Sequence, residues 1–96
     1  MNIFILPSAM DDLAVGFDFY EKQEAGLGDY FMNSLFADVD SLKLYGGIHR
    51  KVFGFHRSLA RRFPFAIYYE MESEQFFVRA ILDCRRDPQW IRQKLK

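Results

Sequence analysis

Cysteine, histidine and proline are scarce in this 96-residue chain, which holds one cysteine, two histidines and three prolines. The single cysteine, Cys84, excludes a disulfide within the chain and fits a reducing compartment. One cysteine and two separated histidines, His49 and His56, provide no spacing typical of a metal site. The sequence also lacks a Gly-x-Gly-x-x-Gly motif and a phosphate-binding loop. We therefore expect neither a metal nor a cofactor.

Long hydrophobic runs are missing as well. No apolar stretch approaches the roughly 18 residues that a membrane-spanning helix needs. The N-terminal residues 1–7 lack the positive charge and the long apolar segment of a signal peptide. These absences predict a cytoplasmic protein that makes no contact with a membrane.

Aromatic residues are abundant by contrast, with eleven phenylalanines, five tyrosines and one tryptophan. Disordered chains are poor in aromatic residues, so this composition predicts a folded core. A chain of this length can bury roughly two thirds of its unfolded surface. We expect residues 1–96 to form a single domain.

Charge is divided unevenly along the chain, although its formal net charge is zero. Residues 1–48 carry eight acidic and two basic side chains, whereas residues 49–96 carry five acidic and eleven basic ones. Such an asymmetry suits a polyanion or an acidic partner that binds the basic half. The alternative is that the two halves attract each other within the fold, and charge alone leaves both interpretations open.

The first half of the sequence predicts a strand and two helices. Residues 3–6 are four consecutive apolar residues, which are typical of a short buried strand. Ser8 stands where a helix N-cap is expected, and Asp11 and Asp12 would lie in the first turn, where acids suit the helix dipole. An apolar stripe with helical spacing then runs to about Glu24 and should face the core. The stripe consists of Met10, Leu13, Phe17 and Tyr20.

A second helix is predicted from near Asp29 to a stop before Gly46 and Gly47. Its apolar face consists of Phe31, Leu35, Val39 and Leu42. Because residues 25–28 form only a short joint, the two helices should make an antiparallel hairpin.

From His49 onward the periodicity becomes that of strands, which we expect at residues 55–61, 65–71 and 76–82, with a turn at 72–75. Asp87 then offers an N-cap and Pro88 a first helical position for a short last helix. The order β-α-α-β-β-β predicts an α+β fold. It is an antiparallel sheet of about four strands, with the two-helix hairpin packed on one face and a short C-terminal helix. The other sheet face should be open or partly open.

Several segments resemble one protein family. They are Pro7-Ser8-Ala9 with Asp12-Leu13, Tyr20-Glu21 with Gly26-Leu27-Gly28, the run Arg61-Arg62-Phe63-Pro64-Phe65-Ala66-Ile67-Tyr68-Tyr69, and Arg85-Arg86-Asp87-Pro88. Together they look like the ParE branch of the RelE/ParE toxins, also called plasmid-stabilisation proteins, over nearly the whole chain. The resemblance implies the fold derived above. It also implies a growth-inhibiting toxin of a type II toxin-antitoxin system, held silent by a cognate antitoxin whose flexible tail folds along it.

The resemblance implies one of two targets. ParE-like toxins trap DNA gyrase on cut DNA, whereas RelE-like toxins cut messenger RNA in the ribosome. This chain departs from the RNA-cutting pattern, because Phe65 and Ala66 stand where those enzymes place an arginine, and no tyrosine follows Tyr69. Trp90 near the C-terminus has no transferable proton of suitable pKa. The sequence thus favours a non-enzymatic gyrase inhibitor with no catalytic residue, over a ribosome-dependent ribonuclease or a non-toxic antitoxin-binding module.

Arginines of the basic half are the main candidates for contacts with antitoxin or target, because arginine binds carboxylates and phosphates through two parallel hydrogen bonds. The full set of candidates is Arg57, Arg61, Arg62, Tyr69, Arg79, Arg85, Arg86, Trp90 and Arg92. The alternative for the arginines is a solvated face whose stems cover apolar surface. An antitoxin segment with alternating apolar anchors and acids would fill the groove between hairpin and sheet and meet the basic half.

Strand alternation predicts where some of these side chains point. Arg57 and Arg61 should share a sheet face with Phe55 and Leu59, and Arg79 should share one with Phe77 and Ile81. Tyr68 and Tyr69 should project to opposite faces, one into the core and one to solvent. The neighbouring arginines 85 and 86 should lower the pKa of the Cys84 thiol.

Overall fold

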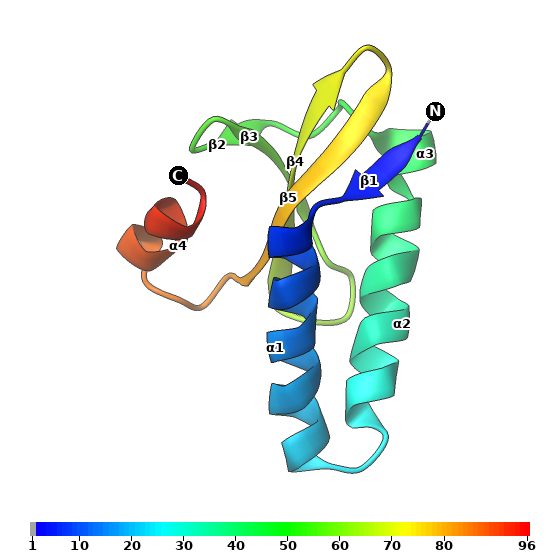
Figure 1. Ribbon diagram of the computed structural model, residues 1–96, viewed down its shortest axis with the longest axis vertical. Helices are drawn as coiled ribbons and strands as arrows, with labels where there is room; N and C mark the ends of the chain where they lie inside the picture. Colours follow the sequence, from blue (N-terminus) through cyan, green and yellow to red (C-terminus); the bar gives the residue numbers. More distant parts are fainter. Residues whose placement is uncertain (1) are drawn as a thin grey trace.

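The computed structural model describes residues 2–96, which form an α+β fold around a five-stranded sheet (Figure 1). The strands lie in the order β1-β5-β4-β3-β2. In chain order the elements are β1 (Ile3–Ile5), α1 (Pro7–Gln23), α2 (Leu27–Asp40), α3 (Leu42–Tyr45), β2 (Lys51–Val52), β3 (Phe55–Leu59), β4 (Phe65–Glu72), β5 (Gln75–Asp83) and α4 (Pro88–Lys94). The predicted fold class, element order and helix hairpin are confirmed.

The sheet differs from the prediction in strand number and direction. It is mixed, because β1 pairs in parallel with β5 while the other neighbours are antiparallel. The chain between β1 and β5 contains both long helices, which is enough to return a strand in parallel. The additional strand, β2, has only two residues and forms a hairpin with β3 through Phe53 and Gly54, both at positive φ. So short a strand leaves no periodic pattern in the sequence.

The predicted hairpin between residues 65 and 82 is confirmed as β4 and β5. Its turn places Ser73 and Glu74 at φ of 50° and 63°. Two consecutive left-handed residues are what a two-residue hairpin turn requires, although Asn-Gly is the common choice there.

Helix α1 begins at Pro7, so the prediction of Ser8 as its N-cap is wrong. Leu6 is the N-cap, no acid lies in the first turn, and the Ser8 hydroxyl instead donates to the carbonyl oxygen of Arg79 at 2.7 Å. Proline suits the first helical position because the missing N–H would have no partner there. The buried stripe is Ala9, Leu13, Gly16 and Tyr20. Met10, predicted in the core, is 41% exposed.

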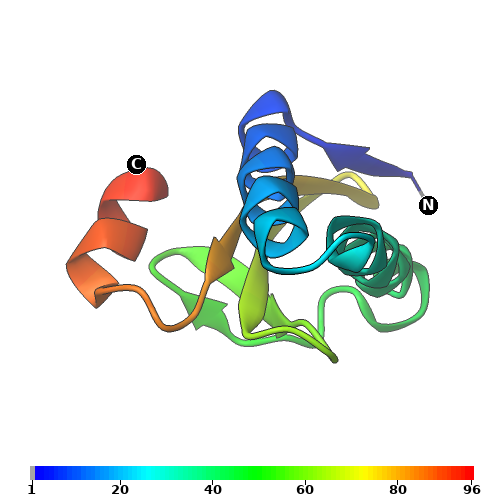
Figure 2. The same cartoon turned by 90° about the horizontal axis from the view of Figure 1, so that it is seen from below.

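The main core lies between the helix hairpin and one face of the sheet (Figures 1 and 2). The predicted face of the second helix is buried as expected, at Phe31, Leu35, Val39 and Leu42. It meets side chains from β4 and β5 that include Ile67, Tyr69, Phe76 and Val78. Gly16 permits the close approach of the helices, because a Cβ there would lie 2.5 Å from the ring of Phe31.

The opposite sheet face is partly covered by α4, which stands apart from the hairpin in both views (Figures 1 and 2). Asp87 caps α4 by accepting from the Gln89 N–H at 2.8 Å, and Pro88 follows, as predicted. A second, smaller cluster results, formed by Ala66, Tyr68, Ala80, Leu82, Ile91 and Leu95. Tyr68 is therefore as buried as Tyr69 on the other face, and the expectation that one of the two is exposed is wrong.

A bulge in β5 changes the alternation of its side chains. Tyr68 pairs with Ala80 while Tyr69 pairs with Val78, so Arg79 is the extra residue. Beyond an extra residue, side chains switch faces relative to strict alternation. Arg79 consequently lies over Phe55 on the α4 side, while Ile81 enters the main core. The prediction that Arg79 and Ile81 share a face is wrong for this reason.

Candidate functional site

Three arginines, Arg57, Arg79 and Arg92, lie on the α4 side of the sheet and at its β2–β3 turn, and two of them lie over aromatic rings. The Arg79 guanidinium is 5.7 Å from the Phe55 ring centre and donates to the Lys96 carbonyl oxygen at 3.3 Å. The Arg92 guanidinium is 5.8 Å from the ring centre of Phe53. Arg57 lies opposite Tyr68 on the neighbouring strand. Burial raises the pKa of the Tyr68 hydroxyl, although a hydrogen bond with Arg57 acts in the opposite direction. None of these arginines is paired with a carboxylate in the described part of the chain.

Arg85 differs, because a carboxylate already holds it. Its Nε donates to Asp83 Oδ1 at 3.0 Å and its Nη2 to Oδ2 at 2.7 Å. These bonds hold the pKa of the Asp83 carboxyl below its ordinary value and raise the pKa of Arg85. The pair offsets the charge that Arg85 would offer to a partner.

Arg61 and Arg62 lie in the exposed connection between β3 and β4. Strand β3 ends at Leu59, so the expectation that Arg61 continues the face of Arg57 is wrong. The Arg61 backbone N–H instead donates to Asp38 Oδ2 at 3.1 Å, where the buried carboxylate of α2 anchors this connection. The two arginines are thus separated from the α4 side.

An apolar groove of about 270 Å³ runs between α1 and α4. Val15 and Phe19 on α1 line one wall and are 71% and 52% exposed. Trp90 lines the other wall, and the Arg86 guanidinium lies 3.8 Å from its ring centre. Exposed large apolar side chains beside a hollow are typical of a binding surface. We call this feature the α1–α4 groove.

Asp12 and Lys94 lie at the base and rim of the α1–α4 groove. Asp12 Oδ2 accepts from the Ile81 N–H at 3.0 Å, and Oδ1 lies 3.9 Å from Lys94 Nζ. Burial raises the pKa of the Asp12 carboxyl, with the Ile81 hydrogen bond and Lys94 acting in the opposite direction. Ser8, one turn earlier, and Asp12 thus form hydrogen bonds with backbone groups of β5 that lie past the segment paired with β1.

Tyr69, one of the predicted contact residues, is fully buried on the hairpin side and does not reach the surface. Its hydroxyl accepts from the Gly47 N–H at 2.9 Å and lies 2.5 Å from His49 Nδ1. His56 stacks on the Tyr69 ring and bonds through Nδ1 to the His49 carbonyl oxygen. Burial raises the pKa of Tyr69 and lowers that of His49. Tyr69 therefore fixes the segment between α3 and β2.

The pKa of the Cys84 thiol is raised, chiefly by burial, so the prediction that Arg85 and Arg86 would lower it is wrong. Desolvation of the thiolate outweighs the nearby arginines. A raised pKa does not activate a thiol as a nucleophile.

The structure brings together only some of the predicted residues. Arg57, Arg79 and Arg92 lie on the α4 side, and Arg86 and Trp90 lie at the α1–α4 groove. Val15 and Phe19, which line one wall of this groove, are not among the predicted contact residues. Their sequence signal is that they form an apolar pair four residues apart, outside the main stripe of the helix.

Among residues 2–96 no cluster of three or more potential metal ligands is present. Within the same residues, no helix combines the length and apolar character needed to cross a membrane.

Comparisons with known proteins support the fold. No protein-family model matches the sequence, and no curated protein matches it. Among solved structures, the chain is similar to a chain of the "Chromosomal ParDE TA system from P. aeruginosa". The TM-score is 0.69 at 16% sequence identity, and the likeness covers 84% of this chain and 92% of that one. At this identity the likeness shows a shared fold.

Proposed function

We propose that the chain is a ParE-like toxin of a type II toxin-antitoxin system, which poisons DNA gyrase and is neutralised by a cognate antitoxin. The observation that carries the proposal is the likeness in fold to a chain of a ParDE toxin-antitoxin system over most of both chains. The family resemblance of the Arg61–Tyr69 and Arg85–Pro88 segments points to the same class from the residues.

The α1–α4 groove supports an antitoxin as partner. Val15 and Phe19 offer apolar surface that no other described element covers. The groove is lined by two cations, Arg86 and Lys94, and by two carboxylates, Asp12 and Asp83. Asp12 lies beside Lys94 and Asp83 is bonded to Arg85, so among the described residues Arg86 is the lining cation that no carboxylate pairs. A segment with apolar anchors and acidic residues matches both properties, since apolar anchors provide area and carboxylates pair with the rim.

The arginines on the α4 side support a polyanionic or acidic target. Among the described residues, Arg57, Arg79 and Arg92 are paired with no carboxylate, and the rings of Phe55 and Phe53 orient Arg79 and Arg92 without neutralising them. Neither histidine lies on this side, since both contact Tyr69 under the other face. A cationic surface without a neighbouring histidine base favours binding over RNA cleavage.

The test of the target uses purified protein, DNA gyrase, supercoiled plasmid and ATP, with linear DNA scored after detergent and protease. We expect linear DNA to accumulate, and the triple variant Arg57→Ala, Arg79→Ala, Arg92→Ala to lose most of this effect. Lys22→Ala, in the last turn of α1, is the charge control and should act like the wild type. Unchanged plasmid with folded protein would reject gyrase as target. Cleavage of message on translating ribosomes would then identify a ribonuclease, and harmless overproduction a non-toxic binding module.

The test of the partner uses the product of a short reading frame adjacent to the gene. We expect tight binding that weakens as salt rises, because part of the attraction is electrostatic. Phe19→Asp should weaken it by at least an order of magnitude, since it places a charge where an apolar anchor docks. Leu44→Asp, at a residue that is 80% exposed on α3, is the matched control. Equal loss in both variants would contradict the groove assignment.

A further inference from the structure

The outer edge of β1 is an open surface distinct from the α1–α4 groove. Strand β1 is one edge of the sheet, and β2 is the other. Natural proteins protect edges with charge, proline, bulges or very short strands. Strand β2 is two residues long and carries Lys51, whereas Ile3–Ile5 contains no charge, proline or bulge. Strand β1 is also short, at three residues, so the absence of charge, proline and bulge makes it the less protected of the two edges.

Two hydrogen bonds fix which backbone groups of β1 face outward. The Asn2 carbonyl oxygen accepts from the Phe76 N–H at 2.9 Å, and the Leu6 N–H donates to the Val78 carbonyl oxygen at 3.0 Å. Peptide groups alternate in direction along a strand, so residues 2, 4 and 6 all face β5. The N–H and C=O groups of Ile3 and Ile5 consequently point to the open edge.

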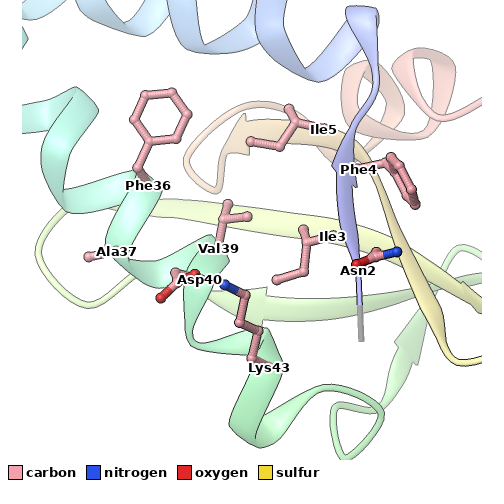
Figure 3. Close-up of a pocket in the computed structure, with 9 residues that line it drawn as sticks. All are labelled: Asn2, Ile3, Phe4, Ile5, Phe36, Ala37, Val39, Asp40 and Lys43. Atoms are coloured by element: carbon pink, nitrogen blue, oxygen red, sulfur yellow. Dashed lines mark ion pairs between the residues drawn. The ribbon is translucent and has the colours of Figure 1, made fainter.

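Both sides of this edge are apolar. Ile3 and Ile5 point toward α2, and Phe4 points to the opposite side (Figure 3). On the α2 side, a cavity of about 750 Å³ is lined by β1 and by α2 residues that include Phe36, which is 38% exposed. On the other side, Phe4 stacks on Phe77 at 5.3 Å between ring centres and remains 43% exposed. A strand laid along β1 would need apolar side chains on both of its faces.

We propose that the β1 edge pairs with the β1 edge of a second copy of this chain. The segment Ile3-Phe4-Ile5 reads the same in both directions, so an antiparallel pair centred on Phe4 is self-complementary. In that register Ile3 opposes Ile5 of the second copy, and their outward N–H and C=O groups exchange hydrogen bonds. Phe4 opposes the same residue of the second copy across the twofold axis, where aromatic cross-strand pairs are favourable.

Charge at the cavity rim favours a second copy over a charged peptide. Asp40 and Lys43 form an ion pair at 2.9 Å on this rim, so the edge presents no excess of either sign. A twofold axis brings identical surfaces together, and a rim without net charge avoids repulsion there. The inference stands independently of the proposed function.

The interface is small, because β1 has three residues. Small interfaces belong to weak, transient complexes. The dimer should therefore form progressively as concentration rises, and sedimentation equilibrium of the full chain should show the mean mass rising from the monomer value toward twice that value.

Variants at Phe4 test the position of the twofold axis. Phe4→Glu and Phe4→Lys should each remain monomeric, because like charges directly opposed across strands repel. An equimolar mixture of the two should recover association, because opposite charges then face each other. Since Phe4 is partly exposed, both variants should keep the wild-type circular dichroism. Leu44→Glu, on α3, should associate like the wild type.

A disulfide trap provides a second, independent measurement. In a Cys84→Ser background, Phe4→Cys should oxidise to a covalent dimer, because opposed residues of a non-hydrogen-bonded pair are close enough for a disulfide. Val15→Cys in the same background should stay monomeric. A wild-type chain that stays monomeric at the highest concentration reached would overturn the proposal. So would Phe4 variants that dimerise normally, or a β1 edge that pairs only with an added antitoxin peptide.

Discussion

The sheet face under the helix hairpin and the face under α4 differ in how their side chains are held. Under the hairpin, Tyr20, Phe31, Phe63 and Phe65 form a cluster of aromatic rings with centres 4.8 to 6.3 Å apart. Under α4, small residues such as Ala66 leave a shallower cluster bordered by arginines. One face thus concentrates apolar burial, while the other keeps cations near solvent.

The largest expected effect tests the hairpin face. Phe31→Ala removes a fully buried ring that contacts Tyr20, Phe63 and Phe65. The lost burial and the remaining cavity should lower the free energy of unfolding by about 3 to 5 kcal/mol. Urea denaturation followed by circular dichroism measures the change. Tyr30→Ala, on the exposed side of the same helix, is the control, and an equal loss in both variants would show that the aromatic cluster is not the main stabilising element.

A smaller effect is expected on the α4 face. Leu95→Ala removes a buried side chain from the smaller cluster and should cost about 2 kcal/mol, near the low end for such truncations, because the terminal helix can shift into the space. Hydrogen exchange should then rise in α4 while β4 and β5 stay protected. Uniform loss of protection throughout the chain would mean that the two faces unfold as one unit.

Helical periodicity and strand alternation predicted most of this fold, because regularly spaced apolar residues mark the buried face of a helix or a strand. The buried face of α2 at Phe31, Leu35 and Val39, the β4–β5 hairpin and the Asp87 cap all follow such local rules. The errors come from contacts between distant segments. At the bulge, the Arg79 carbonyl oxygen and the Ile81 N–H form hydrogen bonds with Ser8 and Asp12 of α1. Tyr68 is buried in a cluster to which the C-terminal residues Ile91 and Leu95 contribute.

The same reasoning explains which candidate residues were misplaced. The number of arginines in the second half of the chain and their places on predicted strands indicated a cationic surface. Only the folded structure shows that Arg61 lies outside the strand that carries Arg57, and that Arg85 is paired with Asp83. The α1–α4 groove joins residues far apart in the sequence, such as Val15 and Trp90. The apolar pair Val15 and Phe19 indicates one wall of the groove, but no local pattern indicates that α4 supplies the other wall.

Asp12 connects the two faces, and its substitutions separate charge from hydrogen bonding. Asp12→Ala leaves the Ile81 N–H without its acceptor and should cost on the order of 1 kcal/mol. Asp12→Asn keeps an acceptor oxygen and removes the buried charge, so its free energy of unfolding at neutral pH should equal or exceed that of the wild type. Equal losses in both variants, measured by urea denaturation, would show that the negative charge itself stabilises the site.

The pH dependence of Asp12 follows from its raised pKa. Between the unfolded value near 3.8 and the higher folded value, the folded state binds more protons than the unfolded chain. Stability from this group is therefore complete below the unfolded pKa and is lost as pH rises through the folded pKa. Asp12→Asn should remove this slope from the pH profile of the urea midpoint. A slope that persists in the variant would assign it to another group.

The smallest expected effect concerns Asp83, whose pKa the Arg85 guanidinium lowers. A lowered carboxyl pKa gives stability that is present above the unfolded value of 3.8 and is lost as pH falls through the folded value. Because Arg85 is exposed, the stability change in Arg85→Gln should be near the limit of detection. The titration midpoint of Asp83, followed by carboxyl NMR, should nevertheless move upward in Arg85→Gln and stay unchanged in Arg62→Gln. An unmoved midpoint would mean that Arg85 does not pair with the Asp83 carboxylate in solution.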